Sequence, residues 1–134
     1  MNDELPPEYK RWLIKSEHHL HAAEILMWSE GPVRDIALYH CERTVVKSLK
    51  AMLLFRNKRL PRTEDITALL RKCKKHDKTF EKWLDEAEDF MMFTSFFTYA
   101  GEVAEANLED SLTTLNQAKE LHEFVASVIR DNPA

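Results

Sequence analysis

The scarcity of helix-breaking residues is the feature that most constrains how this chain folds. Its 134 residues contain only 2 glycines and 5 prolines, which leaves room for few turns. Apolar residues recur every three or four positions over long stretches, as on one face of an α-helix, and no stretch of useful length alternates like a β-strand. We therefore expect an all-α fold: an antiparallel up-and-down helical bundle of four to five helices, with residues 1–134 forming a single domain.

Turn and capping signals predict where the helices begin and end. Proline is tolerated in a first helical turn and glycine ends helices, so Pro6-Pro7 and Gly31-Pro32 bracket a first helix that ends near residue 28. A second helix is expected over residues 33–56, a length that would span the whole domain. The predicted N-caps of the three later helices are Thr63, Asp77 and Asn107.

Composition limits the cellular compartment and the kinds of ligand that the chain is expected to have. The net charge of −4 and a pI near 5.9 provide no global attraction to nucleic acid, so any RNA contact requires a local basic patch. The two cysteines, Cys41 and Cys73, form no disulfide framework and fit reduced thiols. No apolar run approaches the roughly 20 residues of a membrane span, so we expect a cytoplasmic protein with no membrane contact. The chain also has no Gly-rich phosphate loop and no dense set of metal ligands, so we expect no cofactor and no metal.

Two segments carry a family resemblance. Residues 39–54 read Tyr-His-Cys-Glu-Arg-Thr-Val-Val-Lys-Ser-Leu-Lys-Ala-Met-Leu-Leu, and residues 60–70 read Leu-Pro-Arg-Thr-Glu-Asp-Ile-Thr-Ala-Leu-Leu. They resemble the second helix and the Pro-Arg-Thr segment of the HEPN domain family (higher eukaryotes and prokaryotes nucleotide-binding), with His40, Lys47 and Lys50 in register. The opening and closing helices also fit, so the resemblance covers nearly the whole chain.

The chain departs from this family at polar positions. Val46 and Glu64 stand where relatives carry a glutamate and a histidine, and Thr98-Tyr99-Ala100 replaces an Arg-Tyr-Pro sequence. The resemblance implies a helical bundle that commonly pairs as a homodimer. Because the polar signature is eroded, we expect a non-catalytic module that binds nucleotide or RNA, or that partners a small nucleotidyltransferase.

Two other functions stay open at this point. The first is a metal-independent ribonuclease toxin of a toxin–antitoxin pair, since active relatives use an Arg-x4-6-His motif in which the imidazole transfers protons and arginine stabilises phosphate charge. The matching pairs here are Arg11 with His18, Arg34 with His40, and Arg71 with His76. Chance matches are expected for so short a pattern. The second is a helical protein-interaction adaptor with no nucleic-acid role.

Basic residues of the second helix and the following loop are the candidates for phosphate binding. They would share one end of the bundle and form a positive patch there; the residues are Lys47, Lys50, Arg59 and Arg62. The alternative is that these residues form a helix end exposed to solvent, where positive charges interact favourably with the negative end of the helix dipole.

Residues 90–99 form an aromatic-rich stretch with too many apolar side chains for one core-facing stripe. Seven of its ten residues are apolar or aromatic. A second subunit covering part of this surface would account for them, so we expect a homodimer interface. Its predicted residues are Phe93, Phe96, Phe97 and Tyr99.

Overall fold

A long central helix, α2, organises the molecule. The computed structural model describes residues 5–57, 59–98, 103 and 105–132. Across these residues it contains helices and no strand. The elements are α1 (Glu8–Met27), α2 (Arg34–Asn57), α3 (Ile66–His76), a 3-10 turn η1 (Lys78–Trp83), α4 (Leu84–Thr98) and α5 (Leu108–Asp131).

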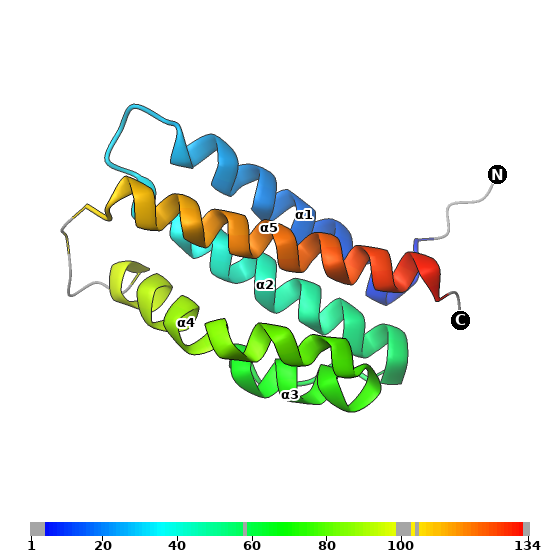
Figure 1. Ribbon diagram of the computed structural model, residues 1–134. Coiled ribbons are helices and arrows are strands. Elements are labelled where there is room, and N and C mark those ends of the chain that lie inside the picture. The colour runs from blue at the N-terminus through cyan, green and yellow to red at the C-terminus, as the bar shows by residue number, and fades with distance from the viewer. Residues whose placement is uncertain (1–4, 58, 99–102, 104, 133–134) are drawn as a thin grey trace.

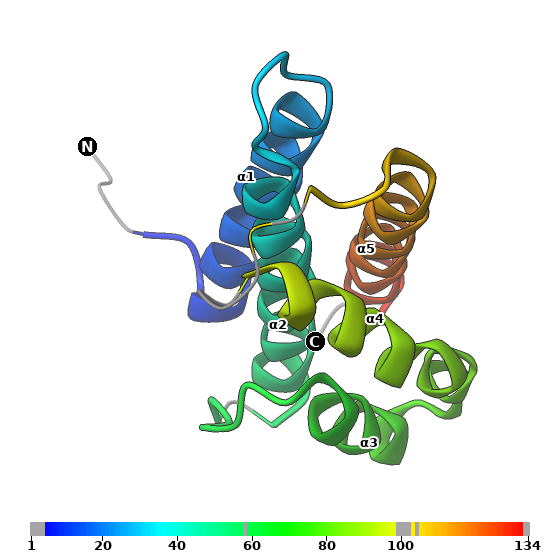
Figure 2. The ribbon, with the colours of Figure 1, turned by 90° about the vertical axis from the view of Figure 1, so that its left-hand side faces the viewer.

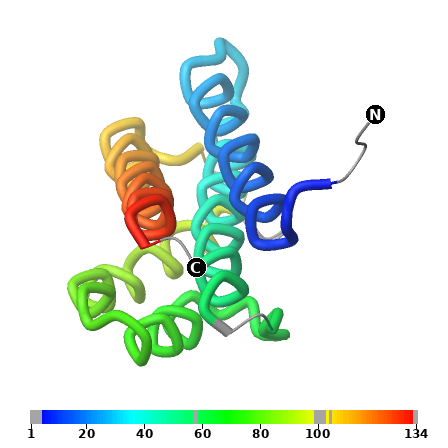
Figure 3. The backbone as a smooth tube through the Cα atoms, turned by 90° about the vertical axis from the view of Figure 1, so that its right-hand side faces the viewer, coloured from blue at the N-terminus to red at the C-terminus, as the bar shows by residue number. Residues whose placement is uncertain are grey.

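The other helices surround α2. In Figure 2, α2 runs through the middle, with α1 on one side, α5 on another, and α3 and α4 on the remaining side. Figure 1 shows that α1, α2, α4 and α5 alternate in direction along the chain, and Figure 3 shows the same arrangement from the opposite side. The predicted all-α, up-and-down bundle is therefore confirmed, with the short α3 inserted between its second and third long helices.

The local capping predictions are confirmed at two helix starts and wrong at a third. Asp77 caps η1 by accepting a hydrogen bond from Thr79 N at 2.9 Å, and Asn107 caps α5 by accepting one from Asp110 N at 3.0 Å. The cap of α3 is Asp65, whose carboxylate accepts from Ala68 N, and not the predicted Thr63. The helix begins later because the carboxylate of Glu64 is engaged with α2.

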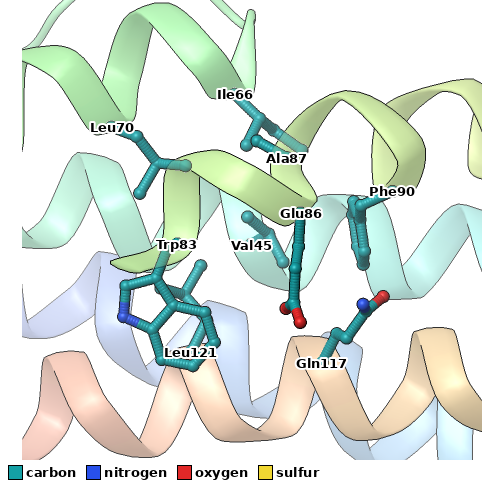
Figure 4. Close-up of a pocket in the computed structure, with 9 residues that line it drawn as sticks. All are labelled: Val45, Ile66, Leu70, Trp83, Glu86, Ala87, Phe90, Gln117 and Leu121. Carbon is teal, nitrogen blue, oxygen red and sulfur yellow. The ribbon is translucent and has the colours of Figure 1, made fainter. Parts of the chain in front are cut away.

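Side chains on nearly all sides of α2 are buried in the core. From residue 44 to residue 55 every side chain of α2 is buried except that of Lys47, as expected for a helix enclosed by others. A small apolar cavity of about 30 Å³ remains between α2, α3, α4 and α5, where Trp83 lies near Leu121 and Phe90 near Gln117 (Figure 4). A space of this size holds little more than a water molecule, so it is a packing defect and not a ligand site.

A buried polar cluster joins three of the helices. His122 of α5 lies with Nδ1 at 2.8 Å from Ser16 Oγ of α1 and 3.2 Å from Ser48 Oγ of α2. Ser16 donates its single hydroxyl hydrogen to the carbonyl of Leu13 at 2.7 Å, and with that bond formed Ser16 can only accept from Nδ1 of His122. Both serines are fully buried, which closes this Ser–His arrangement to any substrate. The cluster therefore fixes how α1, α2 and α5 pack.

We predict that this cluster makes stability depend on pH. Burial lowers the pKa of His122 below 6.5, while the nearby Glu17 and Glu123 act in the opposite direction. Below about pH 6.5 the unfolded chain binds more protons at this residue than the folded chain, so the free energy of unfolding falls as pH falls. Urea unfolding between about pH 7.5 and 5 is expected to show a smaller loss for His122→Gln than for the wild type.

The matched control is His76→Gln, which removes an exposed imidazole at the end of α3. That variant is expected to keep the wild-type pH dependence. An unchanged pH dependence in His122→Gln would contradict the assignment.

Candidate functional site

The outer face of the α1–α2 hairpin carries an open, positively charged hollow. Its volume is about 470 Å³, and we call it the α1–α2 groove. The α1 positions recur at intervals of three and four residues, which places them on one face of the helix, and the α2 positions lie two turns apart. The lining residues are Trp12, Lys15, His18, His19, Ala22, His40 and Lys47.

Two histidines meet across the hairpin. Nδ1 of His19 lies 2.8 Å from Nδ1 of His40, with ring centroids 5.1 Å apart. Burial lowers the pKa of His19 to about 4, and the positive charges of Lys47, Arg43 and Lys15 act in the same direction. Burial also lowers the pKa of His40. Both imidazoles are therefore neutral at pH 7, and one Nδ1–H donates to the other Nδ1.

Two lysines supply the positive charge of the groove. Neither Lys15 nor Lys47 forms an ion pair with a carboxylate in the part of the chain that the structure describes. The ammonium of Lys47 lies 5.9 Å from the centroid of the Trp12 ring, a distance at which the aromatic face attracts a cation. Burial lowers the pKa of Lys47, as do the neighbouring cations Arg43 and Lys15. An anion in the groove would relieve this repulsion.

Beside the groove, Glu64 joins the α2–α3 connection to α2. Its carboxylate accepts a hydrogen bond from Arg43 Nη1 at 2.8 Å and pairs with the ammonium of Lys50. Lys50 is 7% exposed and also lies 5.5 Å from the centroid of the Trp12 ring. Burial raises the pKa of Glu64, but the hydrogen bonds from Lys50 and Arg43 outweigh it, so the net pKa is lowered. This carboxylate stays ionised and neutralises α2 cations.

The four predicted phosphate-binding residues are thus in different situations. Lys47 lines the groove, whereas the ammonium of Lys50 is already paired with Glu64. Arg59 and Arg62 are exposed on the connection between α2 and α3 and do not line the groove. A role for them in phosphate binding stays a prediction.

Among the described residues, no hydrogen bond joins the arginine to the histidine in any of the three Arg–His pairs. Arg34 donates to the carbonyl of Ala106 at 2.9 Å and lies 3.6 Å from Glu105, while His40 contacts His19 on α1. Arg71 and His76 are both exposed on α3. For the remaining pair, His18 lines the groove, and Arg11 donates to the carbonyl of Pro6 at 2.7 Å. Catalysis by any of these pairs stays a prediction.

Sequence reasoning missed Lys15, His19 and the part played by Trp12. The available signal was the turn at Gly31-Pro32. An antiparallel hairpin turning there brings together residues at similar distances from it. His19 meets His40 and Trp12 meets Lys47 in this way.

The chemistry of the groove favours an anion over a metal ion. Among the described residues, no group of three or more His, Cys, Asp or Glu side chains is arranged to hold a metal. The histidine pair is flanked by Lys15, Lys47 and Arg43, whose charges oppose a cation. Lysines without a carboxylate partner and neutral imidazoles are instead suited to phosphate oxygens.

The predicted interface residues lie on α4 or just beyond it. Phe96 is 55% exposed and Met92 is 64% exposed, whereas Phe93 and Phe97 are half-buried and pack against the core. Tyr99 lies outside the described residues. A homodimer through this surface stays a prediction.

Comparison with known proteins identifies a family. A model described as HEPN domain matches residues 9–129, which takes in all five helices almost completely. No curated protein and no solved structure matches the chain. Among the described residues, no helix has both the length and the apolarity needed to cross a membrane.

We predict that Glu64→Gln destabilises the fold. Removing the carboxylate charge leaves the buried ammonium of Lys50 without its counter-ion, a loss of about 1–3 kcal/mol in the free energy of unfolding. Urea unfolding followed by circular dichroism measures this quantity. Glu81→Gln is the matched control, because its partner Lys74 is exposed. Equal small losses in both variants would show that the Glu64 network adds nothing.

We also predict that Phe96→Ser weakens self-association. A phenylalanine buried between subunits contributes about 1.5–3 kcal/mol, so the dissociation constant of a dimer would rise more than tenfold. Sedimentation equilibrium measures this constant, with Ile14→Ser on α1 as the control for losing an exposed apolar side chain. A wild-type chain that is monomeric at every concentration would contradict the homodimer.

Proposed function

We propose that this chain, which belongs to the HEPN domain family, is a non-catalytic module that binds the phosphates of RNA or a nucleotide in the α1–α2 groove. The single observation that carries the proposal is the presence of Lys15 and Lys47 in a hollow without a carboxylate among its lining residues. Charge-assisted hydrogen bonds to phosphate are among the strongest that lysine makes.

The local charge balance supports an anionic ligand. Arg43 and Lys50 are offset by Glu42 and Glu64, which pair with them. The lysines of the groove therefore remain as a net positive charge on a chain whose total charge is −4. Such a patch supplies the local attraction that the whole molecule lacks.

The placement of the arginines supports binding without catalysis. Arg34, the arginine that the family motif would couple to His40, is hydrogen-bonded to Ala106 at the start of α5. His40 contacts a second neutral imidazole in its place. Partnership with a small nucleotidyltransferase is a separate prediction that this proposal does not require.

We predict that Lys15→Gln and Lys47→Gln each weaken the binding of a short oligouridylate. Each lost ammonium removes about one phosphate contact, so the slope of log K against log salt falls by roughly 0.7 for a single-stranded ligand. Fluorescence anisotropy over a salt series measures both affinity and slope. Lys72→Gln, which removes an exposed ammonium from α3, is the matched control and is expected to change the slope little.

Three outcomes would count against the proposal. Equal losses in all three lysine variants would mean that net charge matters and the groove does not. Cleavage of the oligouridylate by the wild type, abolished in His40→Ala, would favour the ribonuclease alternative. Failure to bind any oligonucleotide would leave the adaptor function as the better account.

A further inference from the structure

We propose that the His19–His40 pair takes up one proton when an anion occupies the α1–α2 groove, which makes the binding of polyanions stronger at acidic pH. This inference deepens the proposed function and rests on it. It concerns the regulation of the groove by protons.

The geometry of the pair limits how it holds protons. The two Nδ1 atoms are 2.8 Å apart, a hydrogen-bond distance that requires one hydrogen between them. The ring that donates this hydrogen has a bare Nε2, and the ring that accepts it carries its own hydrogen on Nε2. The neutral pair therefore has one Nε2 donor and one Nε2 acceptor beyond the shared hydrogen bond.

Only one ring nitrogen of the pair can accept an added proton. Protonation of the bare Nε2 keeps the Nδ1–H···Nδ1 bond intact and gives the pair a single positive charge. A second proton would require hydrogens on both Nδ1 atoms, which face each other at 2.8 Å. The pair is thus built to accept one proton from solvent, and no other bond forms or breaks.

Burial, together with the surrounding positive charges, opposes the uptake of that proton while the groove is empty. The titratable groups around the pair come from α1 and α2 and are Lys15, His18, Tyr39, Arg43 and Lys47. The cations among them oppose protonation, and the carboxylate of Glu64 beside the groove is occupied by Arg43 and Lys50. This arrangement agrees with the low pKa of His19, about 4.

A bound anion would change the charges around the pair so that they favour protonation. Phosphates seated on Lys15 and Lys47 offset the charges that oppose the proton and add an attraction of their own. An opposite charge within hydrogen-bonding reach raises the pKa of an imidazole by about 1–3. Linkage is reciprocal, so the proton strengthens anion binding by the same factor as the anion strengthens proton binding.

The test compares oligouridylate affinity at about pH 5 and about pH 7.5 on the intact chain. Neither phosphodiesters nor uracil titrate in this range, so a change in affinity belongs to the protein. A rise of about 2 in the pKa of His19 from its value of about 4 predicts roughly tenfold tighter binding at pH 5. Calorimetry in two buffers of different ionisation enthalpy is expected to show uptake of close to one proton per bound groove.

Variants distinguish proton uptake by the His19–His40 pair from proton uptake by other histidines. The double variant with His19→Gln and His40→Gln removes both imidazoles and is expected to lose the pH dependence and the proton uptake. His18→Gln and His76→Gln are the controls, the first inside the groove and the second on α3, and both are expected to keep most of it. Circular dichroism at pH 5 verifies that each variant is folded under the conditions of the comparison.

The possible results distinguish the two proposals. Lysine-dependent binding of equal strength at both pH values would overturn the proton linkage and leave the proposed function standing. A pH dependence lost only in His18→Gln would also overturn it, because the proton would then sit on that exposed imidazole. Absence of binding at either pH would overturn both.

Discussion

The burial of α2 is the constraint on which the rest of the structure depends. A helix enclosed by four others cannot leave a polar side chain without a partner, because an unpaired buried group loses its hydration and gains nothing in return. Ser48 lies beside His122, Lys50 pairs with Glu64, and Thr44 donates to the carbonyl of His40. His40, at the margin of the buried face, reaches across to His19. The polar residues of α2 therefore determine which parts of α1, α5 and the α2–α3 connection lie against it.

These pairings divide the cations of the α1–α2 hairpin into those held by carboxylates and those without a carboxylate partner that could bind a ligand. Lys50 was predicted to bind phosphate, but it is held by a carboxylate, as is Arg43 on the same helix. Lys15 and Lys47 occupy a hollow whose other polar residues are imidazoles. Positive charge that has been left unpaired beside neutral histidines is a costly arrangement for a fold alone, since the neighbouring cations add to the effect of burial in lowering the pKa of His19 and of Lys47. A bound anion is the simplest physical compensation.

The sequence was sufficient for features governed by local chemistry. Helical periodicity and the few breakers predicted the all-α bundle, and the caps at Asp77 and Asn107 followed from side chains that bond within three residues. The prediction failed at Thr63, because Glu64 is drawn out of the helix by cations more than ten residues earlier in the chain. The groove was missed for the same reason. Its residues lie on two helices, and only the register of the hairpin places His19 opposite His40.

The location of the three histidines with lowered pKa has a consequence for how the molecule unfolds in acid. His19, His40 and His122 all lie at contacts among α1, α2 and α5, whereas the contacts of α3 and α4 with α2 are made by apolar residues such as Leu69 and Phe90. Protonation of these histidines is therefore expected to weaken the contacts among α1, α2 and α5 before those of α3 and α4 with α2. We expect a partly ordered acid form that retains α3 and α4 against α2 after α1 and α5 have detached.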